Sequence, residues 1–179
     1  MASAPLTRTL LGPGLYLALA GALVLARLVP LSPGSGGWPG PDLLLCLTLA
    51  WVLRRPDLLP IGLVAAVALL SDLLLGRPPG LWAALLVLAT EYMRGRSQPG
   101  QEPSLTGEVA LFAVICTLLV CANWLLMAIF MVPQPPLPAL LAQVPVTVLA
   151  YPLVVLVLVQ LAGIRRAAET GRGFGGGRA

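Results

Sequence analysis

The longest uncharged stretch of the chain lies in its second half, and it constrains the fold more than any other feature. No charged residue and no histidine occurs between Val109 and Ile164. At 1.5 Å per helical residue, this stretch is more than twice as long as the ~20 residues that cross a bilayer. Prolines near its middle remove backbone donors that a helix requires. They are Pro133, Pro135, Pro136 and Pro138. The pattern predicts a hairpin of two transmembrane helices.

Composition extends this prediction to the whole chain. Of the 179 residues, 58% are hydrophobic and 10% are charged, whereas soluble domains carry roughly 25% charged residues. Such a chain has too few polar groups to cover a folded surface in water, but its apolar side chains could face lipid. The three cysteines lie within apolar runs, where they are expected to pack as small hydrophobic residues. We therefore predict an all-α, polytopic transmembrane helical bundle forming one domain, residues 1–164.

Apolar runs divide this domain into about six spanning segments. The second and fourth are short for a ~30 Å hydrocarbon core, so five or four full spans remain alternatives. The tail, residues 165–179, is basic and Gly-rich and is expected to be disordered. It would either anchor the last span or contact anionic membrane lipids. The predicted spans cover residues 10–31, 38–53, 58–76, 80–93, 109–132 and 137–164.

The arginines predict the orientation of these spans. With six spans and a cytoplasmic N-terminus, only Arg27 and Arg77 lie toward the outer side. The others fall on the cytoplasmic side, as the positive-inside rule requires. They are Arg8, Arg54, Arg55, Arg94, Arg96, Arg165, Arg166, Arg172 and Arg178. We therefore predict a multi-pass inner-membrane protein with both termini in the cytoplasm.

Motifs of catalysis are missing from the sequence. It contains no histidine, no Cys-x-x-Cys pair, no phosphate-binding loop and no nucleophile elbow. The arginines flank apolar runs, whereas a nucleic-acid-binding domain would gather them on one folded face. We expect a protein that is not an enzyme, holds no cofactor or metal, and binds no nucleic acid.

Four charged residues are predicted to gather near the outer surface: Arg27, Asp42, Asp72 and Arg77. Ionisable groups are costly in a bilayer, so mutual pairing would lower the cost of insertion. Asp72 is the deepest acid in the predicted topology, and Arg27 lies at similar depth. We expect these two to pair, either to fix the packing of the first three spans or to leave an acid for a partner or lipid head group.

Two further polar residues lie within predicted spans. Glu91 is expected to pair with Arg94, three residues later on the same helix. Asn123 lies in the middle of the fifth span, where an interhelical hydrogen bond is more common than a ligand site.

Small residues recur every fourth position along the first span, at Gly14, Ala18, Ala22 and Ala26. Such a ridge lets helix backbones approach closely. The neighbour is either another helix of the same bundle or a helix of a partner protein.

Three stretches between residues 38 and 96 together resemble a known family. They are Pro41-Asp42-Leu43-Leu44-Leu45, Arg54-Arg55-Pro56-Asp57, and Ser71-Asp72-Leu73-Leu74-Leu75-Gly76-Arg77-Pro78-Pro79-Gly80-Leu81. Together they resemble MreD, the family of rod shape-determining membrane proteins, in its alphaproteobacterial form. The third stretch is the most specific of the three.

The resemblance implies a non-enzymatic component of the inner-membrane machinery for cell elongation. Its partners would be an MreC-like bitopic protein and, indirectly, an MreB-like cytoskeleton and a RodA–transpeptidase synthase. The implied fold is similar to that of the substrate-binding subunits of energy-coupling-factor vitamin transporters. The alternative function is therefore a small-molecule-binding transporter subunit, with Trp38, Trp82 and Trp124 as candidate aromatic contacts.

Overall fold

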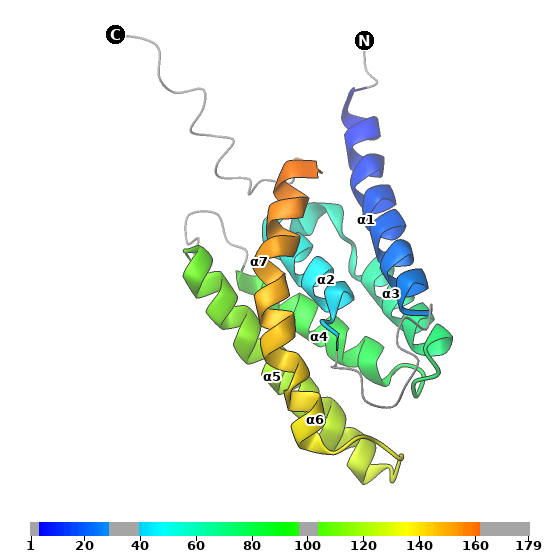
Figure 1. The fold of residues 1–179 in the computed structure, drawn as a ribbon. Helices are drawn as coiled ribbons and strands as arrows, with labels where there is room; N and C mark the ends of the chain where they lie inside the picture. Colours follow the sequence, from blue (N-terminus) through cyan, green and yellow to red (C-terminus); the bar gives the residue numbers. More distant parts are fainter. Residues whose placement is uncertain (1–3, 29–39, 97–103, 162–179) are drawn as a thin grey trace.

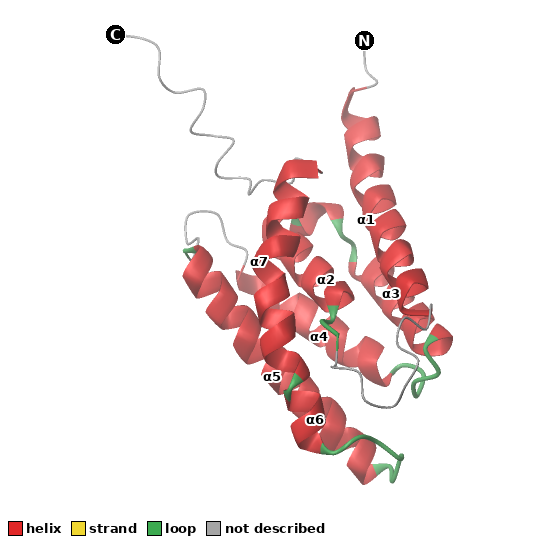
Figure 2. Ribbon diagram, viewed as in Figure 1, coloured by secondary structure: helices red, strands yellow, loops and turns green. Residues whose placement is uncertain are grey.

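The structure of the chain is a computed structural model, and it describes residues 4–28, 40–96 and 104–161. All regular structure in these ranges is helical (Figure 2), which confirms the predicted all-α fold. The predicted tail, residues 165–179, lies outside the described residues. The helices are α1 (Ala4–Leu28), α2 (Leu43–Arg54), the short 3₁₀ helix η1 (Pro56–Leu58), α3 (Ile61–Leu74), α4 (Leu81–Arg96), α5 (Leu105–Ile129), α6 (Leu137–Leu141) and α7 (Gln143–Leu161).

Helix α2 is the centre of the bundle. Every residue from Leu44 to Arg54 is buried, and the helix packs against α1, α4 and α7. A helix that is apolar on all sides is stable only when neighbours surround it. Its 12 residues give a length of about 18 Å. The predicted span 38–53 is therefore a shorter helix, and its length alone would not cross a ~30 Å core.

Within the described residues, two segments are long and apolar enough to cross a membrane. One is α5, and the other is Leu137–Gln160, which contains α6 and most of α7. Shorter apolar helices cover Gly12–Leu28, Leu43–Arg54 and Ile61–Leu74. Three prolines of the cluster, Pro133, Pro135 and Pro136, lie in the connection between α5 and α6, as expected for residues that cannot donate a helical hydrogen bond. Pro138 lies in the first turn of α6, where proline is tolerated.

Helices α6 and α7 form one continuous apolar segment and therefore run in the same direction. Figure 1 shows α1 descending and α7 ascending, so the start of α1 and the end of α7 point the same way. Hydrogen bonds define two opposite ends of the bundle. The "arginine end" holds Arg54 and Arg94 with the connection between α2 and α3. The "cavity end" holds Arg27 and Asp42 with the start of α7.

The turn between α3 and α4 lies within residues 71–81 and ends α3 with a left-handed glycine. Gly76 has φ +65° and follows the last turn of α3. Its N–H donates to the Leu73 carbonyl at 3.4 Å, and the Arg77 N–H donates to the Asp72 carbonyl at 2.9 Å. This pair of bonds is a Schellman motif, which needs a left-handed residue and therefore favours glycine.

Candidate functional site

Arg27 and Asp42 form an ion pair at the cavity end. Arg27 Nη2 lies 3.4 Å from Asp42 Oδ1 and donates to the Pro41 carbonyl at 2.9 Å. Asp42 also caps α2, because its Oδ1 accepts from the Leu45 N–H at 3.2 Å. Its own N–H donates to Thr147 Oγ1 at 3.1 Å. Asp42 thereby joins the C-terminal end of α1 and the start of α2 to the first half of α7.

Asp72 has a different partner from the one expected, so the prediction that it pairs with Arg27 is wrong. The carboxylate is buried, with 0% of the residue exposed. Its Oδ2 accepts from the Gly80 N–H at 3.2 Å and the Ala83 N–H at 3.1 Å. It therefore satisfies donors at the start of α4, which would otherwise lack partners.

Arg77 follows the same turn, and within the described residues its guanidinium forms no ion pair with either acid of the predicted cluster. Its guanidinium lies 5.6 Å from the centre of the Trp82 ring, a cation–π contact. Among the described residues it forms no ion pair. The four predicted residues thus divide into one ion pair, one helix cap and one arginine packed on an indole.

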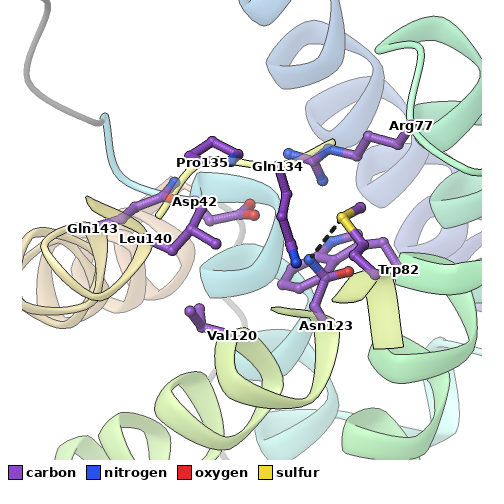
Figure 3. Close-up of a pocket in the computed structure, with 10 residues that line it drawn as sticks. Asp42, Arg77, Trp82, Val120, Asn123, Gln134, Pro135, Leu140 and Gln143 are labelled. Carbon is purple, nitrogen blue, oxygen red and sulfur yellow. Dashed lines mark hydrogen bonds between the residues drawn. The ribbon is translucent and has the colours of Figure 1, made fainter. Parts of the chain in front are cut away.

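A cavity of about 190 Å³ lies beside Arg77 (Figure 3). The close-up shows Asp42 and Arg77 reaching toward it from opposite sides. Two amide oxygens on its wall, Asn123 Oδ1 and Gln134 Oε1, are buried and have no hydrogen-bond partner within the described ranges. The lining residues are Asp42, Arg77, Trp82, Val120, Asn123, Met127, Gln134, Pro135, Leu140 and Gln143.

Asn123 was expected to bond across to another helix, and that expectation is wrong. Its Nδ2 lies 3.9 Å from the sulfur of Met127, one turn along the same helix. Trp82, one of the candidate aromatic contacts, lines the cavity. Trp124 does not line the cavity, but its carbonyl accepts from Gln134 Nε2 at 3.1 Å. Trp38 lies outside the described residues.

Glu91 pairs with Arg94 at the arginine end, as their spacing predicts. Arg94 Nε donates to Glu91 Oε1 at 2.9 Å. The same guanidinium also donates to two carbonyls of the α2–α3 connection, Pro56 at 2.5 Å and Leu59 at 2.7 Å. The pair therefore holds the end of α4 against that connection.

Sequence reasoning missed a buried ion pair and the hydrogen bonds around it. Arg54 donates to both carboxylate oxygens of Glu108, at 2.6 and 3.2 Å. The two side chains are only 5% and 1% exposed. Tyr151 donates its hydroxyl to Glu108 Oε1 at 2.6 Å, and its ring stacks on Phe112 at 4.1 Å. This network joins α2, α5 and α7, three helices that are distant in sequence.

The neighbouring arginine provides a contrast. Arg55 pairs with Asp57 at 3.0 Å, but the two side chains are 36% and 59% exposed. The hydrogen bond from Arg55 lowers the pKa of the Asp57 carboxyl. Exposed pairs of this kind contribute little to stability, so adjacent arginines in one motif have very different roles.

The predicted small-residue ridge of α1 lies on the outside of the described bundle. Gly14, Ala18, Ala22 and Ala26 are all exposed. The opposite side of the helix carries a second ridge at the same spacing, and this one is buried: Gly12, Tyr16, Ala20 and Val24. Within it, Tyr16 bonds to Thr48 Oγ1 at 2.9 Å and contacts Trp51 edge-on. Packing of the predicted ridge inside the described bundle is therefore excluded.

Comparison with known proteins does not assign the chain to a family. A scan against protein-family models, a search of curated proteins and a search of solved structures gave no match. The part of the chain that the structure describes also contains no group of three His, Cys, Asp or Glu side chains placed to hold a metal ion.

Proposed function

We propose that the chain is a multi-pass inner-membrane protein that serves as a non-enzymatic scaffold in the cell-elongation machinery. Exposed apolar surface supports the membrane location. In the most apolar 18 residues of α5, only 22% of the residues are buried, and the fraction is the same for Leu137–Gln160. Leu118, Leu149 and Leu153 are each more than half exposed. Soluble monomers rarely expose apolar surface on this scale, whereas lipid is compatible with it.

The orientation in this proposal follows the arginines. Arg54, Arg55 and Arg94 all lie at the arginine end, which would face the cytoplasm under the positive-inside rule. The cavity end would then face the outer leaflet. A reporter that is active only in the periplasm, fused after Ala179, should give no signal. A strong signal would reverse the proposed orientation.

The exposed ridge of α1 is the observation that carries the scaffold role. Positions 18 and 22 lie two residues from buried positions of the same helix, which rotates them by about 200° around its axis. The ridge therefore faces away from α2 and α3, and its small side chains leave room for another backbone. We propose that it packs against the transmembrane helix of an MreC-like bitopic partner, which would link the chain indirectly to an MreB-like cytoskeleton and a RodA–transpeptidase synthase.

Co-purification of an MreC-like partner tests this role. Ala22→Leu fills the ridge without touching the buried side of α1, so it should reduce the recovered partner while the level of the chain in the membrane stays unchanged. Ala22→Gly keeps the surface small and serves as the matched control, with partner recovery retained. Equal recovery from the Leu and Gly variants would refute the proposed docking face.

The alternative function, a substrate-binding subunit of a vitamin transporter, has one observation in its favour. The cavity end does contain a pocket with a tryptophan and polar side chains. However, its volume of about 190 Å³ is below the roughly 300–1,000 Å³ of typical small-molecule sites. The pocket suits a smaller group than a whole vitamin.

A further inference from the structure

We propose that the cavity beside Arg77 binds a phosphate ester that carries free hydroxyl groups, such as a glycerol phosphate group. The inference begins with the hydrogen-bond acceptors of its wall. Gln134 Nε2 donates to the Trp124 carbonyl, and a carbonyl can only accept. The orientation of this amide is therefore fixed, with Oε1 buried and without a partner among the described residues. Such an acceptor favours a ligand that supplies a donor.

Asn123 supplies a second acceptor of the same kind. Its Oδ1 is buried and unpartnered within the described ranges, and the side chain lies on the cavity wall in Figure 3. Hydroxyl groups donate to such oxygens and tolerate varied geometry because the hydrogen rotates about the C–O bond. Two acceptors on one wall therefore favour a ligand with hydroxyl groups.

The charge balance of the cavity favours an anion. Asp42 already faces Arg27 across 3.4 Å, so the charges of these two largely offset each other. Arg77 packs on Trp82 and has no ion pair among the described residues, which leaves one positive charge at the cavity. A guanidinium presents parallel N–H groups that match two oxygens of a phosphate. The small volume limits the bound part to a head group.

An apolar groove next to the cavity indicates where an attached chain would lie. It has a volume of about 470 Å³. Pro78 and Leu81 line the groove, while their sequence neighbours Arg77 and Trp82 line the cavity. A phospholipid would place its head in the cavity and an acyl chain in the groove. A free glycerol phosphate would occupy the cavity alone, so the two sources of the same chemistry are separable.

Native mass spectrometry of the purified full-length protein tests the proposal. The probes are phosphatidylglycerol and phosphatidylethanol with identical acyl chains, because both carry one anionic phosphate but only the first carries free hydroxyls. We expect roughly tenfold tighter binding of phosphatidylglycerol, since its phosphate and hydroxyls both find partners. Arg77→Gln should weaken this binding by roughly tenfold. Gln134→Leu should abolish the preference for phosphatidylglycerol over phosphatidylethanol.

Arg96→Gln is the matched control for Arg77→Gln. Arg96 also lies over an aromatic ring, that of Tyr92 at 5.2 Å, but it is exposed at the opposite end of α4. Its substitution should leave lipid binding unchanged. Equal affinity for the two lipids, or equal effects of the two arginine substitutions, would overturn the proposal. If Arg77→Gln fails to fold, Gln134→Leu tests the hydroxyl preference by itself.

A parallel thermal-shift titration with free glycerol 3-phosphate identifies the source of the ligand. A shift that Arg77→Gln removes would assign the site to the soluble ester, and its absence together with selective lipid binding would assign it to the lipid. The lipid source rests on the membrane location proposed above. Loss of the partner in Ala22→Leu is measured separately, so failure of the scaffold role and failure of the ligand site are distinguishable.

Discussion

Removing the negative charge of Glu108 should destabilise the protein far more than removing an exposed charge such as that of Asp57. Glu108 and Arg54 are almost fully buried and share two hydrogen bonds. Glu108→Gln keeps the shape but leaves the Arg54 charge without its counterion. Breaking a buried pair in this way costs about 3–5 kcal/mol. For a chain of this length, each kcal/mol lowers the melting temperature by roughly 2–4 °C, so the expected decrease is about 6–20 °C.

The assay heats a detergent-solubilised fluorescent fusion to a series of temperatures and measures, by size-exclusion chromatography, how much folded protein remains at each one. Asp57→Asn is the matched control, because it breaks the exposed pair with Arg55 and should cost under about 1 kcal/mol. Tyr151→Phe should lie between them, since it removes one hydrogen bond to a charged group, worth about 1.5–3 kcal/mol.

Replacing the whole network tests the reasoning from the other side. The triple variant Arg54→Met, Glu108→Leu and Tyr151→Phe replaces all three polar side chains of the network with apolar ones. Apolar replacement of a complete buried pair is often neutral or stabilising, so this variant should recover most of the melting temperature lost in Glu108→Gln. A Glu108→Gln variant within about 2 °C of the parent chain would refute the argument.

Three further predictions concern the cap and turn residues at the cavity end of the bundle. Asp72→Asn keeps an oxygen for the N–H groups of Gly80 and Ala83 and should be nearly silent, whereas Asp72→Ala should cost about 0.5–2 kcal/mol in chemical or thermal unfolding. Gly76→Ala forces a side chain to φ +65° and should cost about 1 kcal/mol in the same assay. Met131 has φ +53° at the end of α5, so Met131→Gly should raise the melting temperature slightly, by relieving that conformation.

The sequence predicts where helices lie along the chain better than it predicts which helices pack against each other. Uncharged runs and the proline cluster were sufficient to place α5 and the segment that follows it, because both signals are local. Depth along a span is also readable, since Arg27 lies close to an acid of the outer group as expected. Depth does not give lateral position, however, and the acid that Arg27 meets is Asp42, not Asp72.

Long-range pairs and helix faces were beyond the sequence for physical reasons. Arg54 and Arg55 look alike as flanking charges, and only packing of α5 and α7 around α2 buries the first and exposes the second. The charged residue in the first turn of an otherwise apolar helix, Glu108, was the available signal. Helix α1 carries two ridges with four-residue spacing and is apolar around its circumference, so spacing could not show which ridge faces inward.

Depletion of the protein in its bacterial host tests the central claim most directly. Cell width and length are imaged as the protein disappears, with re-expression of the intact chain as the control. The scaffold account predicts that rod-shaped cells widen and become round. Normal rods, accompanied by a growth defect that an added vitamin relieves, would contradict the account and favour the transporter subunit.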